Sequence, residues 1–397
     1  MNREDFPILN SNIIYLDNGA TTLKPNKVID AINDYYKNYS VNIHRGEYDL
    51  SFKADQAYEK ARVTVANFIN ANTRSIVFTK GTTDSLNMIV DGYFKDHLNT
   101  NDEVLITKAE HASNVLPWFN LAKEKGIKVN FIELDDKLSV TLENVKNAIT
   151  DNTKVISLAG ITNVIGDIRP IKEICEYAHS KGILVVEDGA QSVPHMKVDV
   201  KDSNVDFLAF SGHKLCGPTG IGVLYIKEEL IDEFKVSEFG GGMNESFDSI
   251  DEVYLKDAPT RFEAGTPNIA GAIGLASAIE YLNSIGMDKI HTYEVELKKY
   301  LVDKLSTIPH IRIYNPTSES GIVSITIEDI FPQDAGYYLN KYNICVRTGN
   351  HCAKLLKDEI NVRNTLRISL YFYNTKEELD KLVELLSDKN KIISEMI

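Results

Sequence analysis

Three short segments carry side chains that could act together in chemistry, and each follows an apolar run typical of a buried strand. The first, KGTTD, spans residues 80 to 84. Gly81 permits a tight turn, and the hydroxyls and backbone N–H groups of Thr82 and Thr83 then lie at the start of a helix, where phosphate groups bind. A threonine-rich helix cap without a ligand explains these residues equally well. The segment alone is therefore a weak indication of a phosphate site.

The other two segments supply a carboxylate and a lysine. Asp188 and Gln191 lie in VVEDGAQ, and Ser211, His213 and Lys214 lie in AFSGHKL. A lysine becomes a nucleophile that forms imines when it is desolvated near other cations, whereas most lysines are solvated on loops. Pyridoxal phosphate requires a phosphate cradle, a carboxylate that pairs with its ring nitrogen and an imine-forming lysine. The three segments together predict a site for this cofactor.

The elements that must position these segments are indicated by a regular alternation. From about residue 74, helical patterns follow each of the apolar runs SIVFTK, EVLIT, KVNFIEL and KVISLAG, and the runs ILVVED, DFLAFSG and GVLYIK come next with shorter connections. This predicts the α/β class, with a mainly parallel sheet of the seven-stranded type and helices on both faces. Ligands bind such sheets beyond the carboxyl ends of the strands, so Gly81, Asp188 and Lys214 are expected at one edge.

The pattern changes beyond about Gly286, where a charged helical stretch leads to short strands and a final helix from about Lys376. We predict a large cofactor-binding domain over residues 14–285 and a smaller α+β domain over residues 286–397, on which residues 1–13 pack.

The composition excludes several classes of protein. The 397 residues include 43 basic and 57 acidic side chains, a formal charge of −14, and no basic run, which argues against a nucleic-acid ligand. The absence of a signal-peptide pattern and of a long apolar window predicts a cytoplasmic protein that does not enter a membrane. The four cysteines lack CxxC spacing, so we predict neither a metal site nor disulfides.

Eight motifs make the prediction more specific. They are LDNGATTLKP (16–25), FTKGTTDSLN (78–87), EHASNVLPW (110–118), NVIG (163–166), EDGAQSVPH (187–195), SGHKLCGPTGIGVLY (211–225), RFEAGTPN (261–268) and VRTGNHCA (346–353). Together they resemble the class V aminotransferase branch of the fold-type I pyridoxal phosphate enzymes, and more closely a cysteine desulfurase of the SUF type. The resemblance runs from about residue 14 to the end of the chain.

The resemblance implies a role for each matching residue around the cofactor ring. Lys214 would bind the cofactor covalently and remove the Cα proton of the substrate. His111 would stack on the ring, although without its motif it reads as a core histidine. Asp188 would pair with the ring nitrogen, and Gln191 would contact the ring hydroxyl.

The resemblance also implies the phosphate contacts. Thr83, Ser211 and His213 would hold the phosphate, with Thr82 as an adjacent donor. Thr266 would reach across the interface of a homodimer to the phosphate of the neighbouring subunit.

The implied substrate is L-cysteine. Asn163, which also lies beside the cofactor, Arg347 and Arg367 would bind it, with Arg367 holding the carboxylate through two parallel hydrogen bonds. The Cys352 thiolate, stabilised by His351 and Arg347, would attack the substrate sulfur, release L-alanine and keep a persulfide. A sulfur-acceptor protein of iron–sulfur cluster assembly would then receive the sulfur.

Alternative functions and departures from the family pattern remain. The alternatives are a selenocysteine lyase or related C–S lyase on the same scaffold, an aminotransferase, and a non-catalytic sulfur carrier or assembly partner. The departures are Asn350, Tyr48, Gly160 and the segment FPQD (331–334), where relatives commonly have histidines.

Overall fold

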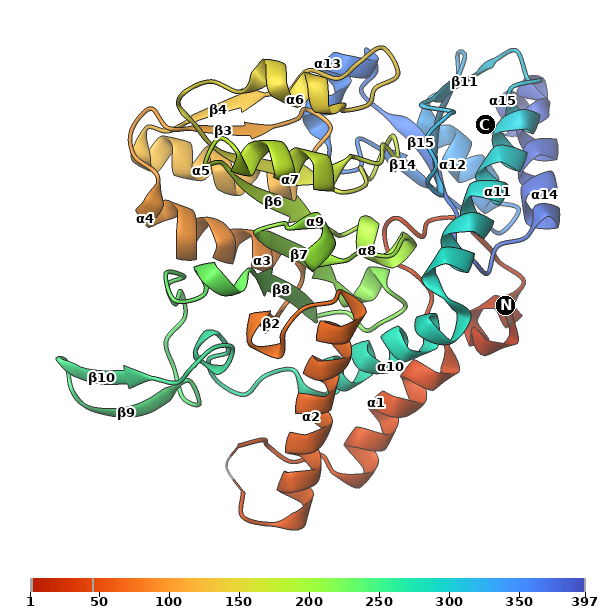
Figure 1. Ribbon diagram of the computed structural model, residues 1–397. Helices are drawn as coiled ribbons and strands as arrows, with labels where there is room; N and C mark the ends of the chain where they lie inside the picture. Colours follow the sequence, from red (N-terminus) through yellow and green to blue (C-terminus); the bar gives the residue numbers. More distant parts are fainter. Residues whose placement is uncertain (1–2, 45, 396–397) are drawn as a thin grey trace.

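A computed structural model describes residues 3–44 and 46–395 (Figure 1). Seven strands form the central sheet in the order β2–β8–β7–β6–β5–β3–β4. They are β2 (Ile76–Thr79), β3 (Glu103–Ile106), β4 (Lys128–Phe131), β5 (Thr153–Ala159), β6 (Leu184–Asp188), β7 (Phe207–Ser211) and β8 (Gly222–Ile226). Neighbouring strands are parallel except β8, which is antiparallel to both β2 and β7. The predicted α/β class and mainly parallel sheet are confirmed.

Helices cover both faces of this sheet because its central strands are apolar on both sides. Val185 and Val186 are adjacent in β6, yet they belong to different hydrophobic clusters, one on each face. The Val185 face packs on α2 (Asp49–Phe68), α6 (Leu142–Ala148), α7 (Ile171–His179) and α10 (Ile269–Ile285). The Val186 face packs on α3 (Thr82–Ile89) and α5 (Leu116–Lys125).

A second, antiparallel sheet lies in the C-terminal part of the chain, with the strand order β11–β12–β15–β14. Its strands are β11 (Ile311–Tyr314), β12 (Ile322–Ile327), β14 (Arg347–Gly349) and β15 (Thr365–Ser369). Its helices are α11 (Met287–Leu305), α12 (Pro332–Asn340), α14 (Lys376–Ser387) and α15 (Lys389–Glu395), and they share one apolar cluster with the sheet.

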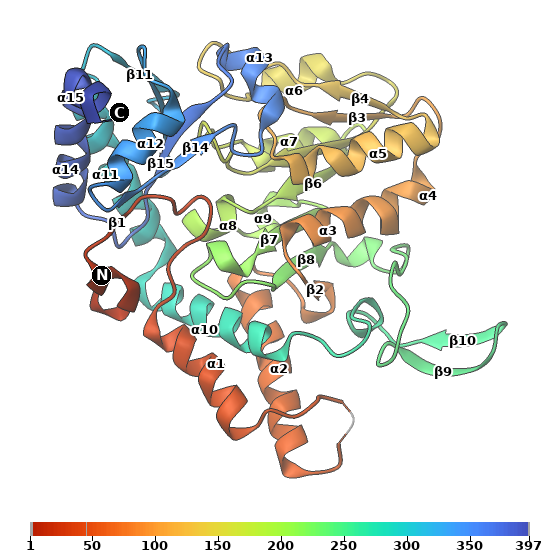
Figure 2. The ribbon, with the colours of Figure 1, turned by 180° about the vertical axis from the view of Figure 1, so that it is seen from behind.

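The N-terminal segment joins this second part of the molecule, as Figure 2 shows. Strand β1 (Ile14–Tyr15) pairs in parallel with β13 (Ile344–Cys345). Phe6 is fully buried against Tyr281 of α10 and against Phe372 and Tyr373, which follow β15. The first residues therefore connect the two parts of the molecule.

The remaining elements are shorter or project outward. They are α1 (Asn26–Asn38), α4 (Lys95–His97), α8 (Ser192–His195), α9 (Val200–Ser203), α13 (Lys357–Ile360), β9 (Asn244–Ser249) and β10 (Glu252–Leu255). Strands β9 and β10 form a hairpin that extends away from the body in both views and exposes Phe247 and Ile250. Among residues 3–44 and 46–395 no single helix is long and apolar enough to cross a membrane, whereas α10 and α11, bent by 74°, pass that test only as a pair.

Candidate active site

A cavity of about 200 Å³ opens where the carboxyl edge of the central sheet meets the second sheet. Its lining collects most of the residues singled out from the sequence, although they come from seven separate segments. These are Thr82, Thr83, His111, Asn163, Asp188, Gln191, Ser211, His213, Lys214, Arg347 and Arg367. Ligand binding at this edge is the behaviour expected of an open α/β sheet.

The turn between β2 and α3 forms one end of the cavity. Gly81 has a φ of +152°, and a Cβ on Gly222 of β8 would lie 2.4 Å from the Gly81 Cα, so this close approach requires glycine. Ser211 Oγ accepts the Thr82 N–H at 2.7 Å, and Thr83 Oγ1 lies 2.7 Å from Ser113 Oγ. Hydroxyls and a helix N-terminus therefore converge where a phosphate would bind.

Asp188 and Gln191 lie deeper in the cavity. Asp188 ends β6, and its Oδ1 accepts the Ala190 N–H at 3.0 Å. Burial raises the pKa of Asp188 to about 6, although the nearby Lys214 cation opposes this shift. The Gln191 Nε2 donates to Gly19 O at 2.8 Å, which directs the amide into the cavity.

Lys214 follows β7 and is an unusually weak base. Burial lowers the pKa of Lys214 to about 8, against the opposing influence of Asp188. A substantial fraction of the amine is therefore neutral, as a nucleophile requires.

The histidines of the cavity are neutral. His111 Nδ1 accepts the Ser113 N–H at 3.1 Å, which leaves the proton on Nε2. Burial, together with the Lys214 cation, lowers the pKa values of His111 and His213 to about 4. A neutral His213 therefore contributes a ring N–H but no positive charge to the phosphate end of the pocket.

Lys24 is a cation near the pocket that sequence reasoning did not single out. Its Nζ donates to Thr21 Oγ1 at 3.1 Å and to His213 O at 2.9 Å. Burial lowers the pKa of Lys24 to about 8. Its place in the motif LDNGATTLKP was the available signal.

Arg367 of β15 lies at the opposite side of the cavity and is fully buried. Its Nη1 donates to Asn163 O and its Nη2 to Asp17 Oδ1, both at 2.9 Å. Asp17, which sequence reasoning missed, therefore holds the guanidinium in place. The Nε of Arg367 has no hydrogen-bond partner among the described residues.

Cys352 is exposed on the loop that follows β14. Its φ of 60° is in the left-handed region, and its N–H donates to Asn350 Oδ1 at 3.1 Å. Cys352 O accepts the Ala112 N–H at 2.7 Å, next to His111. The Nη2 of Arg347 lies 3.9 Å from Cys352 Sγ. Asn350, a departure from the family pattern, thus helps to shape this loop.

His351 does not assist the thiolate as expected. Its ring is buried, and Nε2 lies 2.9 Å from Thr365 Oγ1. Burial and the nearby Arg367 cation lower the pKa of His351 to about 3, so the ring is neutral. A neutral His351 that faces Thr365 does not supply the expected charge beside the thiolate, whereas the Arg347 guanidinium lies 3.9 Å from the sulfur.

Comparison with known proteins identifies the family. The model of the family described as aminotransferase class-V matches residues 14–382. The chain belongs to the class-V aminotransferase family.

Individual relatives are similar to this chain over nearly the whole length of both proteins. A protein of Halalkalibacterium halodurans named "Probable cysteine desulfurase" is 43% identical, with 96% of this chain and 95% of the relative covered. The apo structure of a cysteine desulfurase from Thermococcus onnurineus NA1 superposes with a TM-score of 0.94 at 39% identity, covering 99% and 97% of the two chains. The cysteine desulfurase CsdA of Escherichia coli superposes with a TM-score of 0.92 at 35% identity, covering 100% and 98%.

The cavity fits pyridoxal phosphate, the cofactor that the family implies. Four buried polar atoms on residues that line the cavity lack hydrogen-bond partners among the described residues: Gln191 Oε1, Asn163 Oδ1, His351 Nδ1 and Arg367 Nε. Buried polar atoms are almost always paired, so a polar ligand is expected there. The ring hydroxyl of pyridoxal phosphate and the carboxylate of an amino-acid substrate would supply polar partners of this kind.

Thr266 lies outside this cavity. It lines a separate hollow beside Lys80 and Glu238, and Asn42 Nδ2 lies 3.4 Å from its Oγ1. Among the described residues no group of three or more His, Cys, Asp or Glu side chains could hold a metal ion.

Proposed function

We propose that the protein is a pyridoxal phosphate-dependent cysteine desulfurase that converts L-cysteine to L-alanine and forms a persulfide on Cys352. One observation carries this proposal: the exposed Cys352 directly follows His351, which lines the cavity, and its carbonyl oxygen accepts the N–H of Ala112, the neighbour of the cavity residue His111. An aminotransferase has no use for a thiol in this place.

The residues that would hold the cofactor follow from the pocket. Thr82, Thr83, Ser211 and His213 would bind its phosphate, and Lys214 would bind it covalently. When bound, pyridoxal phosphate supplies an electron-withdrawing ring that stabilises negative charge on the substrate carbons. A carboxylate at Asp188 keeps the ring nitrogen protonated.

The remaining residues act on the substrate. Arg367 binds the substrate carboxylate through a guanidinium already oriented by Asp17 and Asn163. The Lys214 amine, in its free and neutral form, would accept the Cα proton of the substrate. His111, neutral with its proton on Nε2, can donate a hydrogen bond without carrying a charge.

The sulfur step needs a thiolate within reach of the substrate. Cys352 Sγ attacks the substrate sulfur, an S–S bond forms, and the C–S bond breaks with its electron pair moving to the substrate carbon. Protonation of that carbon yields alanine, so sulfur is oxidised while carbon is reduced. Arg347, 3.9 Å from Sγ, balances the charge of the thiolate.

We also propose two protein partners, a second copy of this chain and a sulfur acceptor. Thr266 lies on the surface near the projecting β9–β10 hairpin, which supports a homodimer in which Thr266 completes the phosphate site of the partner subunit. The exposed Cys352 would pass its sulfur to an acceptor protein for iron–sulfur cluster assembly. All four cysteines are free, which supports action in a reducing cytoplasm.

The domain division also stays a proposal. We place the large cofactor-binding domain at 14–285 and the small domain, with the N-terminal residues, at 286–397. The pairing of β1 with β13 shows that residues 14–15 also contact the small part.

The test is alanine formation from L-cysteine in the presence of a thiol reductant. We expect Cys352→Ala to lose at least about 100-fold in rate, since no other thiol replaces the nucleophile. Cys345→Ala is the matched control, and its rate should stay within about twofold of the native rate. Native desulfuration by Cys352→Ala would refute the proposed nucleophile.

Two further measurements separate the alternative functions. Selenocysteine turnover that survives in Cys352→Ala while cysteine turnover is lost would indicate a selenocysteine lyase, because selenium is the better leaving group. A purified protein that stays colourless when mixed with pyridoxal phosphate would indicate a non-catalytic role.

A further inference from the structure

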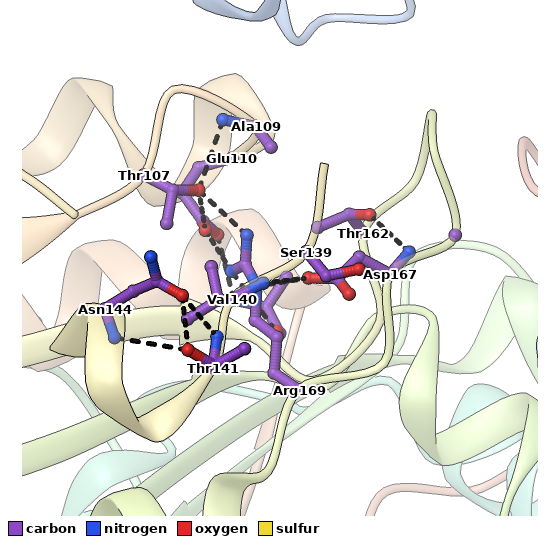
Figure 3. Close-up of polar contacts among 12 residues, drawn as sticks. Thr107, Ala109, Glu110, Ser139, Val140, Thr141, Asn144, Thr162, Asp167 and Arg169 are labelled. Carbon is purple, nitrogen blue, oxygen red and sulfur yellow. Dashed lines mark hydrogen bonds and ion pairs between the residues drawn. The ribbon is translucent and has the colours of Figure 1, made fainter. Parts of the chain in front are cut away.

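A buried ion pair behind the cavity has no part in the mechanism above. The side chains of Glu110 and Arg169 are both fully buried and in direct contact. Figure 3 shows them pointing toward one another beside Thr107. Burying two charges costs several kcal/mol per ion unless further hydrogen bonds compensate. The contacts of the pair therefore indicate what it stabilises.

Glu110 uses both of its carboxylate oxygens. Oε1 accepts the Thr107 hydroxyl at 2.8 Å, and Oε2 accepts the Asn114 Nδ2 and the Ala159 N–H, each at 2.9 Å. The segment from Thr107 to Asn114, which contains His111, is thereby fastened to the end of β5.

Arg169 connects a second segment to the same point. Its Nη2 donates to Thr107 Oγ1 at 2.8 Å, and its Nε lies 3.5 Å from Asp167 Oδ2. Its backbone N–H donates to Gly160 O at 3.0 Å, and the Asp167 N–H donates to Thr162 Oγ1 at 2.9 Å. The turn from Thr162 to Asp167, which contains Asn163, is therefore fixed against the first segment.

These two segments both hold the Cys352 loop. Ala112 donates its N–H to Cys352 O at 2.7 Å, and Asn163 Nδ2 donates to His351 O at 2.7 Å. The buried pair is thus linked to the loop that carries the nucleophile through one hydrogen bond from each segment.

The pair also acts on Asp188 through space. Burial raises the pKa of Asp188 most, and the two members of the pair act on it in opposite directions, since Glu110 raises this pKa and Arg169 lowers it. The other charged group that faces Asp188 is Lys214, because Glu187, the preceding residue, lies on the opposite face of the sheet.

We propose that Glu110 and Arg169 are positioning residues: the pair fixes the His111 and Asn163 segments against each other and thereby orders the Cys352 loop, with its two opposite charges placed near Asp188. This positioning role rests on the proposed function. Its tests measure cofactor affinity and backbone hydrogen exchange, not turnover of cysteine.

The first measurement is the affinity for pyridoxal phosphate as a function of pH, followed by visible absorbance. Affinity should fall at low pH as Asp188 becomes protonated, and this fall is the acid limb of the curve. Glu110→Gln leaves the Arg169 cation unopposed, so the acid limb should move to lower pH. Arg169→Met leaves the Glu110 carboxylate unopposed and should move that limb to higher pH. A difference of one pH unit between the two variants corresponds to about a tenfold difference in relative affinity on the limb.

The second measurement is hydrogen exchange in the cofactor-free protein. Both variants should exchange at least about threefold faster in peptides covering residues 107–115 and 350–356, because the hydrogen bonds of these segments open more often. Arg169→Lys keeps the charge but loses the planar fork, so it should speed exchange without moving the acid limb.

The matched control is Asp206→Asn. Asp206 is a buried carboxylate at the opposite edge of the sheet, where its Oδ2 accepts the Val185 N–H at 2.8 Å and lies 2.8 Å from His179 Nε2. It should lower stability without either effect.

The affinity and exchange measurements test the role of the Glu110–Arg169 pair independently of the cysteine desulfurase assay. Acid limbs that shift in the same direction, or not at all, together with unchanged exchange at residues 350–356, would overturn it. A failure of the cysteine assay would leave both measurements readable. If Arg169→Met does not fold, Arg169→Lys and Glu110→Gln retain the test through exchange and through the acid limb.

Discussion

Lys214 shows how burial sets the chemistry of a single residue. In water a lysine amine is almost wholly protonated at neutral pH, whereas burial lowers the pKa of Lys214 to about 8. The carboxylate of Asp188 limits that shift. The same burial keeps the imidazoles of His111 and His213 neutral, so the positive charge of the pocket comes from lysine and arginine side chains.

The covalent attachment of pyridoxal phosphate should therefore depend on pH in a defined way. Only the neutral amine reacts, and its fraction rises with pH up to and beyond a midpoint near pH 8. Between pH 7 and pH 9 we expect the attachment rate to increase about tenfold. The rate can be followed in the cofactor-free protein by visible absorbance and by borohydride trapping with peptide mass analysis.

Two outcomes matter for that prediction. Lys214→Ala should show no trapped peptide at any pH. A rate that is flat between pH 7 and pH 9 would mean that the amine is not the titrating group.

At the scale of elements, the ends of adjacent strands determine what can stand beside the cofactor. Asp188 at the end of β6 faces the cavity, and Glu187, one residue earlier, faces the other side of the sheet, as alternation requires. Burial raises the pKa of Glu187 to about 7. Its Oε1 accepts the Ser192 hydroxyl at 2.6 Å and occupies the space next to Gly160, just beyond β5.

Gly160→Ala should therefore destabilise the protein. A Cβ at this position would lie 2.3 Å from Glu187 Oε1 and 2.6 Å from Ser192 Oγ. Overpacking of this kind costs about 1–3 kcal/mol, which urea unfolding can measure.

Gly240→Ala is the control for that substitution. Its Cβ would meet its nearest neighbour, Ala264 Cβ, at 3.6 Å, an ordinary contact. Equal stability losses in the two variants would contradict the steric explanation.

At the scale of the whole molecule, the N-terminal segment links the two parts that share the active site. Phe6 contacts Tyr281 of α10 with ring centroids 5.9 Å apart, Phe372 at 5.8 Å and Tyr373 at 4.6 Å. The hydroxyl of Tyr373 in turn donates to Asn18, which lies next to Asp17 and the Arg367 guanidinium.

Phe6→Ala should cost about 3–5 kcal/mol, as expected for a fully buried aromatic side chain. Trp118 is the only tryptophan and is buried on the central sheet, so its fluorescence reports that part alone, whereas far-UV circular dichroism reports the whole chain. We expect both signals to shift to lower urea concentration together.

Ile8→Ala is the matched control, because Ile8 is half exposed, and it should cost about 0.5 kcal/mol. A Phe6→Ala protein whose tryptophan transition stays at the native urea concentration would show that the segment does not couple the two parts.

The sequence by itself determined the α/β class, the apolar runs that became seven strands, and the segments that carry Asp188, Lys214 and Cys352. Local patterns are sufficient to predict the fold class, the strands and these segments, because apolar runs and motifs consist of consecutive residues. Only the tertiary structure decided the neutral state of His351 and the contacts of Asp17, Glu110 and Arg169. The neutral state of His351 depends on burial, and the contacts of Asp17, Glu110 and Arg169 depend on partners more than fifty residues away. Neither burial nor a distant partner can be recognised from the neighbouring residues in the sequence.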